Sequence, residues 1–288
     1  MRPINYLKQN PWFRLMRFDK PIGIYLLLWP TYWGLWFASN GQPSLKNLII
    51  FTLGVIVMRA AGCVINDYAD RHVDGSVDRT KHRPIPAGEI KPTHGLTLFL
   101  ALIVIALFLV LQTNPLTIKL AVVGVFLAAT YPFLKRLTQL PQLGLGIAWA
   151  WAVPMAFAAE QQALPASLWL ISGAIVLWAI AFDTYYAMAD REDDLKIGIK
   201  STAILFGKQD LLIIAVLQIL TLILLATAGN YFNRGWIYDL SLIIAAGYFA
   251  SQHLQARARK TEGCFKAFLN NHRVGMAVFI GLALDYSL

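Results

Sequence analysis

Residues 66–74 read NDYADRHVD and end a long apolar segment, and residues 183–194 (DTYYAMADREDD) repeat this arrangement later in the chain. Each stretch contains two aspartates that are four residues apart, and the two pairs are offset by the same 120 residues (190 − 70). Acids at this spacing share one helix face, where like charges repel by about 0.2–0.5 kcal/mol. The repeated arrangement therefore predicts a cation that offsets the repulsion. The two pairs are Asp70 with Asp74 and Asp190 with Asp194.

The composition is that of a membrane protein. Of the 288 residues 57% are hydrophobic and 14% are charged, and the mean hydropathy is +0.54, whereas soluble domains carry roughly a quarter charged residues. We therefore expect one all-α integral membrane domain over residues 1–288, with the lipid bilayer as its surroundings. The net charge is +9, but we expect no soluble domain that could form a basic groove. We therefore predict no nucleic-acid partner, and no protein partner is implied.

Nine apolar segments are candidate membrane spans, because all but the short last one reach the roughly 17–25 residues that cross a bilayer. Before them, residues 1–21 form an interfacial N-terminal segment, in which Tyr6–Phe18 mixes aromatic and basic side chains. This stretch predicts an amphipathic helix in the membrane surface, with an irregular basic tail as the alternative. The nine spans are Ile22–Ala38, Leu48–Ile65, Gly95–Leu111, Thr117–Phe133, Leu143–Ala159, Leu168–Met188, Leu211–Ala228, Ile237–His253 and Val274–Tyr286.

Lys and Arg predict the orientation. Alternate connections, beginning with the N-terminus, carry 21 of these residues, whereas the other side has only Lys46, Lys119 and Arg234. Because cytoplasmic loops are enriched in Lys and Arg, we expect the N-terminus on the cytoplasmic side of a bacterial inner membrane and the C-terminus outside. The acidic stretches then belong to cytoplasmic loops, residues 66–92 and 183–209.

The offset of 120 residues also predicts how the acids meet. The first motif follows the second span and the second motif follows the sixth, a shift of four helices. An even shift places both motifs on the same membrane face, where a helical bundle can bring them together across a central cavity open to the cytoplasm.

Converging carboxylates at a membrane surface suit Mg²⁺, which binds oxygen ligands and usually shares its coordination with substrate phosphates. Basic side chains beside the acids would hold the remaining phosphate oxygens. A diphosphate with an apolar tail that belongs in the bilayer is a polyprenyl diphosphate. The alternative to a binding site is that these residues are ordinary solvated charges of surface loops. The basic residues are Arg71, Arg79, Lys81, Arg83, Lys196 and Lys200.

Deeper polar residues predict a second part of the site. Arg59 lies two helical turns before Asn66, about 10 Å deeper on the same face, and an Arg within a span by default faces a cavity. It could hold a small carboxylate, or instead form a structural pair. Asp183 lies seven residues before Asp190 and would orient Arg59 or a substrate hydroxyl. Three residues that end the fourth span could bind phosphate, if the helix continues through Pro132, or serve only as a basic flank: Tyr131, Lys135 and Arg136.

These residues resemble the UbiA family of membrane aromatic prenyltransferases, and the resemblance covers essentially the whole chain. Its motifs are strong markers of the superfamily, and the continuation of the second motif into LKIGIKST resembles the hydroxybenzoate branch. The matching stretches are residues 17–23 (RFDKPIG), 66–74, 79–84, 131–136 (YPFLKR) and 183–202.

The resemblance implies transfer of a polyprenyl group from polyprenyl diphosphate to the carbon ortho to the hydroxyl of 4-hydroxybenzoate, a membrane step of ubiquinone biosynthesis. Asp67 would lie near the metal, Arg59 would face the aromatic acid, and Tyr131, Lys135 and Arg136 would line the diphosphate end. The implied Mg²⁺ ligands are Asn66 and the catalytic aspartates Asp70, Asp74, Asp190 and Asp194.

Several alternatives stay open from the residues alone. The acceptor could be homogentisate, dihydroxynaphthoate, haem or a glycerol phosphate, although an acceptor without a carboxylate would leave Arg59 without an obvious role. A CDP-alcohol phosphotransferase also uses aspartates four apart, but Asp74-Gly75 is not followed by its pattern. A cation transporter would place its acids near mid-membrane, whereas these lie at helix ends.

Overall fold

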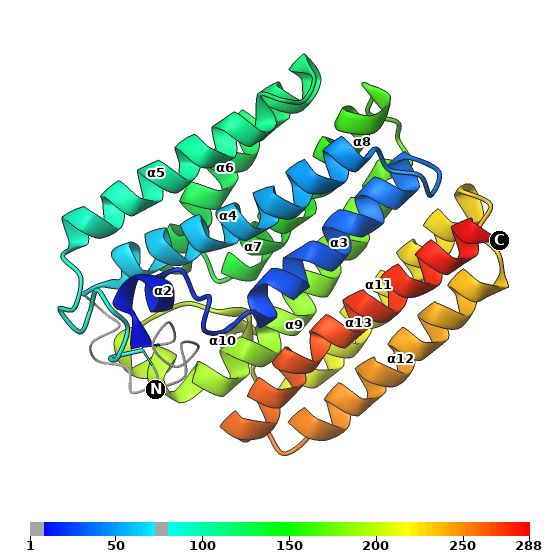
Figure 1. Ribbon diagram of the computed structural model, residues 1–288. Coiled ribbons are helices and arrows are strands. Elements are labelled where there is room, and N and C mark those ends of the chain that lie inside the picture. Colours follow the sequence, from blue (N-terminus) through cyan, green and yellow to red (C-terminus); the bar gives the residue numbers. More distant parts are fainter. Residues whose placement is uncertain (1–8, 73–79) are drawn as a thin grey trace.

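The computed structural model describes residues 9–72 and 80–288, and in these ranges every regular element is a helix. The helices lie side by side along one direction (Figure 1). This confirms the predicted helical bundle. The elements are α2 (Pro11–Leu15), α3 (Ile22–Ala38), α4 (Leu45–Asp70), α5 (Pro92–Val110), α6 (Pro115–Leu137), α7 (Pro141–Ala150), α8 (Ala152–Gln161), α9 (Leu168–Ile197), α10 (Thr202–Phe206), the 3₁₀ turn η2 (Gly207–Gln209), α11 (Asp210–Tyr231), α12 (Trp236–Ala256) and α13 (Thr261–Ser287).

The helices begin where the sequence provides start signals. Four of them have proline in their first turn, at a position where the missing N–H would have no partner within the helix. Side-chain oxygens of Ser44 and Asn114 accept hydrogen bonds from backbone N–H groups of α4 and α6, as N-caps do. Helix α6 continues through Pro132 to Leu137, so Tyr131 and Lys135 do lie one turn apart on one helix.

The segment Leu143–Ala159, which we predicted as one continuous span, is divided between α7 and α8. The two helices meet at Trp151. Pro154 explains the division, because a proline ring clashes with the carbonyl four residues earlier, here that of Ala150, and cannot donate a hydrogen bond to it.

Helix α9 is the centre of the bundle. In its apolar stretch 67% of the residues are buried, compared with 11% in α6 and 17% in α5. The largest core cluster surrounds α9 and contains the indole rings of Trp33 and Trp178, which are fully buried and stack with centroids 5.3 Å apart. The most exposed side of the bundle is therefore formed by α5 and α6.

Helices α4 and α9 run in the same direction, and their carboxyl ends lie at the same end of the bundle as α2 and α10 (Figure 1). The aspartate motifs that end these helices are thus on one face. This is the parallel relation expected from the 120-residue offset.

The apolar helices indicate an integral membrane protein. Among the described residues, seven helical stretches are long and apolar enough to cross a bilayer, and Ile22–Ala38 is a shorter apolar helix. Helix α12 coincides with another predicted span but is not among the seven. The total of nine spans and the opening toward the cytoplasm stay predictions.

Two expectations about local structure need revision. Of the predicted helix Tyr6–Phe18, residues 6–8 lie outside the described residues and Pro11–Leu15 is helical, but the left-handed backbone of Arg17 (φ 58°) prevents the helix from continuing to Phe18. Residues 189–197, which follow the predicted span Leu168–Met188 and were assigned to a loop, instead extend α9 to Ile197. The helix stops there because Gly198 adopts φ 70°, a conformation that glycine tolerates without strain.

Candidate active site

A cavity of about 1100 Å³ lies between α3, α4, α5, α6, α7, α8 and α9. Its polar end is at the carboxyl ends of α4 and α9, and apolar side chains such as Leu107, Val110 and Val122 line the part that extends along α5 and α6. Eleven of the predicted site residues line this one cavity. They are Arg59, Asn66, Asp67, Asp70, Arg83, Tyr131, Lys135, Asp183, Asp190, Asp194 and Lys200.

The first motif faces the cavity from the last turn of α4. Asp67 and Asp70 are 1% and 2% exposed, so their charges need partners from other elements. Asp67 Oδ1 lies 3.5 Å from Arg83 Nη1 and 3.6 Å from Arg17 Nη2. Asp70 Oδ2 accepts a hydrogen bond of 2.5 Å from Lys135 Nζ on α6.

Two predicted residues have other positions, and two are not described. Arg136 does not line the cavity, although its Nη2 lies 3.8 Å from Asp70 Oδ1 and donates to the carbonyl of Ala69 at 2.6 Å. Lys81 is exposed and lies away from the cavity lining. Asp74 and Arg79 fall outside the described residues.

The second motif is presented by the last turns of α9. Asp190 and Asp194 line the cavity, and the chain after Gly198 folds back so that the backbone N–H of Lys200 donates to the carbonyl of Lys135 at 3.2 Å. This hydrogen bond joins the end of the second motif to the helix that supplies the cation for Asp70. The two motifs are therefore held across the same end of the cavity.

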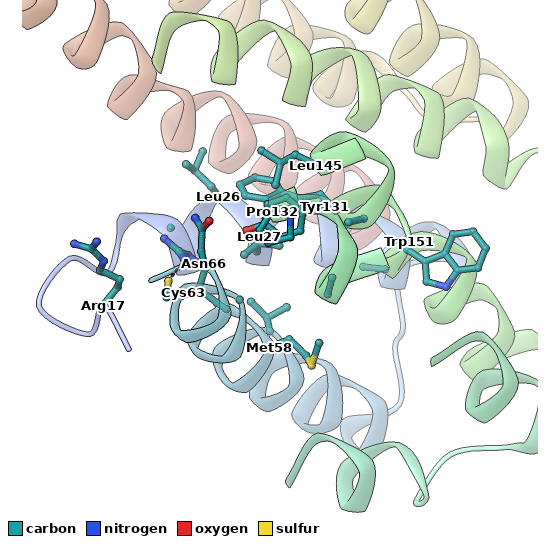
Figure 2. A pocket seen from close by; sticks show the side chains of 18 of the residues that line it. Arg17, Leu26, Leu27, Met58, Cys63, Asn66, Tyr131, Pro132, Leu145 and Trp151 are labelled. Atoms are coloured by element: carbon teal, nitrogen blue, oxygen red, sulfur yellow. Dashed lines mark hydrogen bonds between the residues drawn. The ribbon is translucent and has the colours of Figure 1, made fainter. Parts of the chain in front are cut away.

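Deeper in the cavity, Arg59 extends along α4 toward the first motif. Its Nη1 donates to Cys63 Sγ one turn later, and its guanidinium lies directly against the backbone of Gly23 on α3. Figure 2 shows Cys63 and Asn66 on α4, with Tyr131 projecting from α6. Arg59 is thus held between α4 and α3, within the lining of the cavity.

Asp183 is supported by a side chain that the sequence analysis did not identify. Gln142, in the first turn of α7, hydrogen-bonds with Asp183 and accepts from the backbone N–H of Thr202 at 3.1 Å. Arg17 and Lys20 also line the cavity but were counted only as topology signals. Their position directly before the first apolar segment, inside the stretch RFDKPIG, could have identified these two as site residues. No feature of the sequence indicates a site role for Gln142.

The oxygen ligands at the polar end of the cavity fit Mg²⁺. Amide and carboxylate oxygens of Asn66, Asp70, Asp190 and Asp194 line one cavity, and such oxygens are the ligands that Mg²⁺ prefers. Among the described residues, Asp70 Oδ1 is buried without a hydrogen-bond partner, and its nearest cation is Arg136 Nη2 at 3.8 Å, so this oxygen can still accept a bond from a metal ion. Within residues 9–72 and 80–288 no three acidic, His or Cys side chains form a ready metal cluster. Such a cluster is not required, because Mg²⁺ usually binds through one or two carboxylates together with substrate phosphates.

Comparison with known proteins identifies the family. The model of the UbiA prenyltransferase family matches residues 27–278, which is most of the chain. The chain belongs to this family. The resemblance inferred from the aspartate motifs is thereby confirmed.

Curated members of the UbiA family are similar over nearly the full length. A 4-hydroxybenzoate octaprenyltransferase of Saccharophagus degradans is 55% identical, with 99% of this chain and 96% of that protein covered. Another from Ectopseudomonas mendocina is 57% identical, with 96% and 93% covered.

Solved UbiA structures share the fold. A UbiA homologue from Aeropyrum pernix without ligand matches with a TM-score of 0.81 and 24% identity, over 91% of this chain and 97% of that one. A UbiA homologue from Archaeoglobus fulgidus, bound to GPP and Mg²⁺, matches with a TM-score of 0.77 and 21% identity, over 97% and 100%. At these identities the likeness shows the fold alone, and it confirms the predicted UbiA-type bundle.

Proposed function

We propose that this chain is a Mg²⁺-dependent polyprenyltransferase that joins a polyprenyl group to the ring carbon ortho to the hydroxyl of 4-hydroxybenzoate, with diphosphate as the other product. One observation carries the proposal: a single cavity combines two aspartate motifs, a deep arginine and a long apolar wall. These features match the diphosphate, the carboxylate and the polyprenyl tail. The curated relatives at 53–57% identity carry this activity in their names and support the same substrates.

The residues at the polar end of the cavity would bind the diphosphate. When bound, Mg²⁺ supplies positive charge to the diphosphate oxygens as the allylic C–O bond breaks. Asn66, Asp70, Asp190 and Asp194 would hold the metal, with Asp74 as a further candidate ligand. Cationic side chains would stabilise the charge that develops on the leaving group. These would be Arg79, Arg83, Lys135 and Lys200, with Asp67 orienting Arg83, whereas Lys81 and Arg136 do not line the cavity.

The deep end would bind the acceptor. Arg59 would hold the carboxylate of 4-hydroxybenzoate through charge-assisted hydrogen bonds, and Tyr131 and Asp183 would lie beside the ring. The ring carbon ortho to the hydroxyl attacks the allylic cation, and loss of its proton restores the aromatic ring. The apolar walls of the cavity exclude water that would otherwise capture the cation.

We also propose that the whole chain forms one domain in the inner membrane, with the N-terminus and both motifs in the cytoplasm and the C-terminus outside. The distribution of Lys and Arg supports this orientation. The shared end of α4 and α9 in Figure 1 agrees with it, because both motifs then reach water-soluble hydroxybenzoate from one side.

A transfer assay tests the function. Membranes containing the protein would receive radiolabelled 4-hydroxybenzoate, a polyprenyl diphosphate and Mg²⁺, and the lipid-soluble fraction would be counted with and without EDTA. We expect transfer that EDTA abolishes and that Asp70→Asn or Asp190→Asn removes. Asp239→Asn is the matched control, because Asp239 is an exposed acid in the first turn of α12, away from the cavity.

Arg59→Ala tests the acceptor site separately. Loss of a charged hydrogen bond worth about 1.5–3 kcal/mol should raise the KM for the aromatic acid roughly tenfold to a hundredfold. Transfer that is unaffected by Arg59→Ala would refute the acceptor site but not the enzyme. No transfer at any prenyl chain length would refute hydroxybenzoate as the acceptor.

A further inference from the structure

A fully buried carboxylate outside the cavity is linked to the second aspartate motif. Asp210, the first residue of α11, is 0% exposed and does not line the cavity. Its Oδ2 accepts a hydrogen bond from Arg191 Nη2 on α9. Its Oδ1 accepts from Arg259 Nη2 at 2.9 Å and from Arg259 Nε at 3.1 Å. One carboxylate thus holds two guanidinium groups, a geometry that gives directional as well as electrostatic attachment.

The position of Arg259 is itself fixed by the turn between α12 and α13. Its backbone adopts φ 52°, which a residue with a side chain rarely adopts unless its surroundings enforce it. Arg259 Nη2 also donates to the carbonyl of Lys208 at 3.0 Å. Asp210 therefore joins three segments: the end of α9, the start of α11 and the turn before α13.

The attachment point on α9 lies within the motif. Arg191 follows Asp190 directly and precedes Asp194 by three residues. Successive residues of an α-helix are about 100° apart around its axis, at 3.6 residues per turn. Asp190 and Asp194 therefore share the face toward the cavity, whereas Arg191 is directed to Asp210. Holding Arg191 determines how the end of α9 is rotated, and with it the direction of both aspartates.

We propose that Asp210 is a positioning residue for the second aspartate motif. Through Arg191 it holds Asp190 and Asp194 in the orientation that binds the metal and the prenyl diphosphate. This inference rests on the proposed function. It also assigns Arg191 a role other than direct contact with phosphate, since its guanidinium is engaged by a buried carboxylate that does not line the cavity.

The main test compares Asp210→Asn with a matched control, Asp285→Asn. Asp285 is also a mostly buried acid, paired with Arg234 at 3.5 Å and accepting from the N–H of Gly235 at 2.8 Å. It lies at the opposite end of the bundle, near the C-terminus (Figure 1). Both variants remove one buried charge from an ion pair. Only Asp210→Asn should affect the motif.

The measurement is made on the full-length protein purified in detergent. Thermal unfolding is followed with increasing Mn²⁺ or Mg²⁺ in the presence of a non-reactive prenyl thiodiphosphate, and initial transfer rates are measured separately. For Asp210→Asn we expect the metal concentration for half-maximal stabilisation to rise at least tenfold, with an unchanged KM for hydroxybenzoate. Asp285→Asn should lower the unliganded Tm but leave the metal affinity unchanged. Equal metal affinities in the two variants would overturn the inference.

Two further variants separate the partners of Asp210. Arg191→Gln keeps the contact of Asp210 with Arg259 and should weaken metal binding as Asp210→Asn does, whereas Arg259→Gln should weaken it less. The Arg191 and Arg259 variants also provide the test if Asp210→Asn does not fold. Weak metal binding in Arg191→Gln but not in Asp210→Asn would overturn the inference, because Arg191 would then contact the ligand itself. If the unaltered protein shows no metal-dependent stabilisation, the proposed function fails as well.

Discussion

Replacing Gly23 by Ala should displace Arg59 without unfolding the protein. A Cβ at position 23 would lie 2.3 Å from Arg59 Nε and 2.8 Å from Cζ, whereas ordinary contacts begin at 3.4 Å. The guanidinium must therefore move by about 1 Å (3.4 − 2.3). Gly23 is the second residue of α3, so Ala should suit the helix backbone at least as well as glycine. The strain is relieved by moving the flexible end of one side chain.

The expected effect is on the acceptor. A misplacement of about 1 Å in a positioning group can cost up to about a hundredfold in rate. We therefore expect kcat/KM for 4-hydroxybenzoate to fall roughly tenfold to a hundredfold, about 1.4–2.8 kcal/mol, mainly through KM. The KM for the prenyl diphosphate and the Tm should change little. Initial rates at saturating prenyl diphosphate, together with thermal unfolding, measure these quantities.

Two comparisons make this prediction refutable. Gly54→Ala is the matched control, because Gly54 also lines the cavity but an added Cβ there would meet nothing within 4 Å. In the Arg59→Ala background, Gly23→Ala should have almost no further effect, since the group that it displaces is absent. A full additive loss in the double variant would show that Gly23 does not act through Arg59. An unchanged KM in the single variant would refute the acceptor site derived from this contact.

Three further predictions follow from other parts of the structure. Lys135→Ala should raise the KM for prenyl diphosphate roughly tenfold or more, because a charged hydrogen bond is worth about 1.5–3 kcal/mol. The KM for the acceptor should stay unchanged, and steady-state rates with each substrate varied separately would show both effects. An alkaline phosphatase fused after Leu288 should be active, whereas one fused after Gly207 should be inactive, and the reverse pattern would refute the orientation. Gly146→Leu should lower the Tm, because an added Cβ lies 3.0 Å from the carbonyl of Val176 and overpacking typically costs about 1–3 kcal/mol; Gly247→Ala, with nothing within 4 Å of its Cβ, should not.

Arg59 shows how much of the proposed acceptor site could be predicted from the sequence. The interval between Arg59 and Asn66 predicted a deep cation on the motif face of a helix, and both residues do line the cavity. The contact with Gly23 was beyond prediction, because Gly23 is on a different helix and nothing local indicates which face of α3 meets α4. The same holds for Gln142, whose partners Asp183 and Thr202 are 41 and 60 residues away (183 − 142 and 202 − 142).

Local patterns by themselves determined the helical class, the positions of the helices and the shared face of the two aspartate motifs. These features depend on apolar length, on helix start and stop residues and on spacing, all of which are short-range properties. Only the tertiary structure decided which charges meet. Lys135 approaches Asp70, Arg17 and Arg83 approach Asp67, and Asp210 holds Arg191 and Arg259. The physical reason is that a buried charge must find a partner wherever packing brings one, and packing joins residues that have no regular separation along the chain.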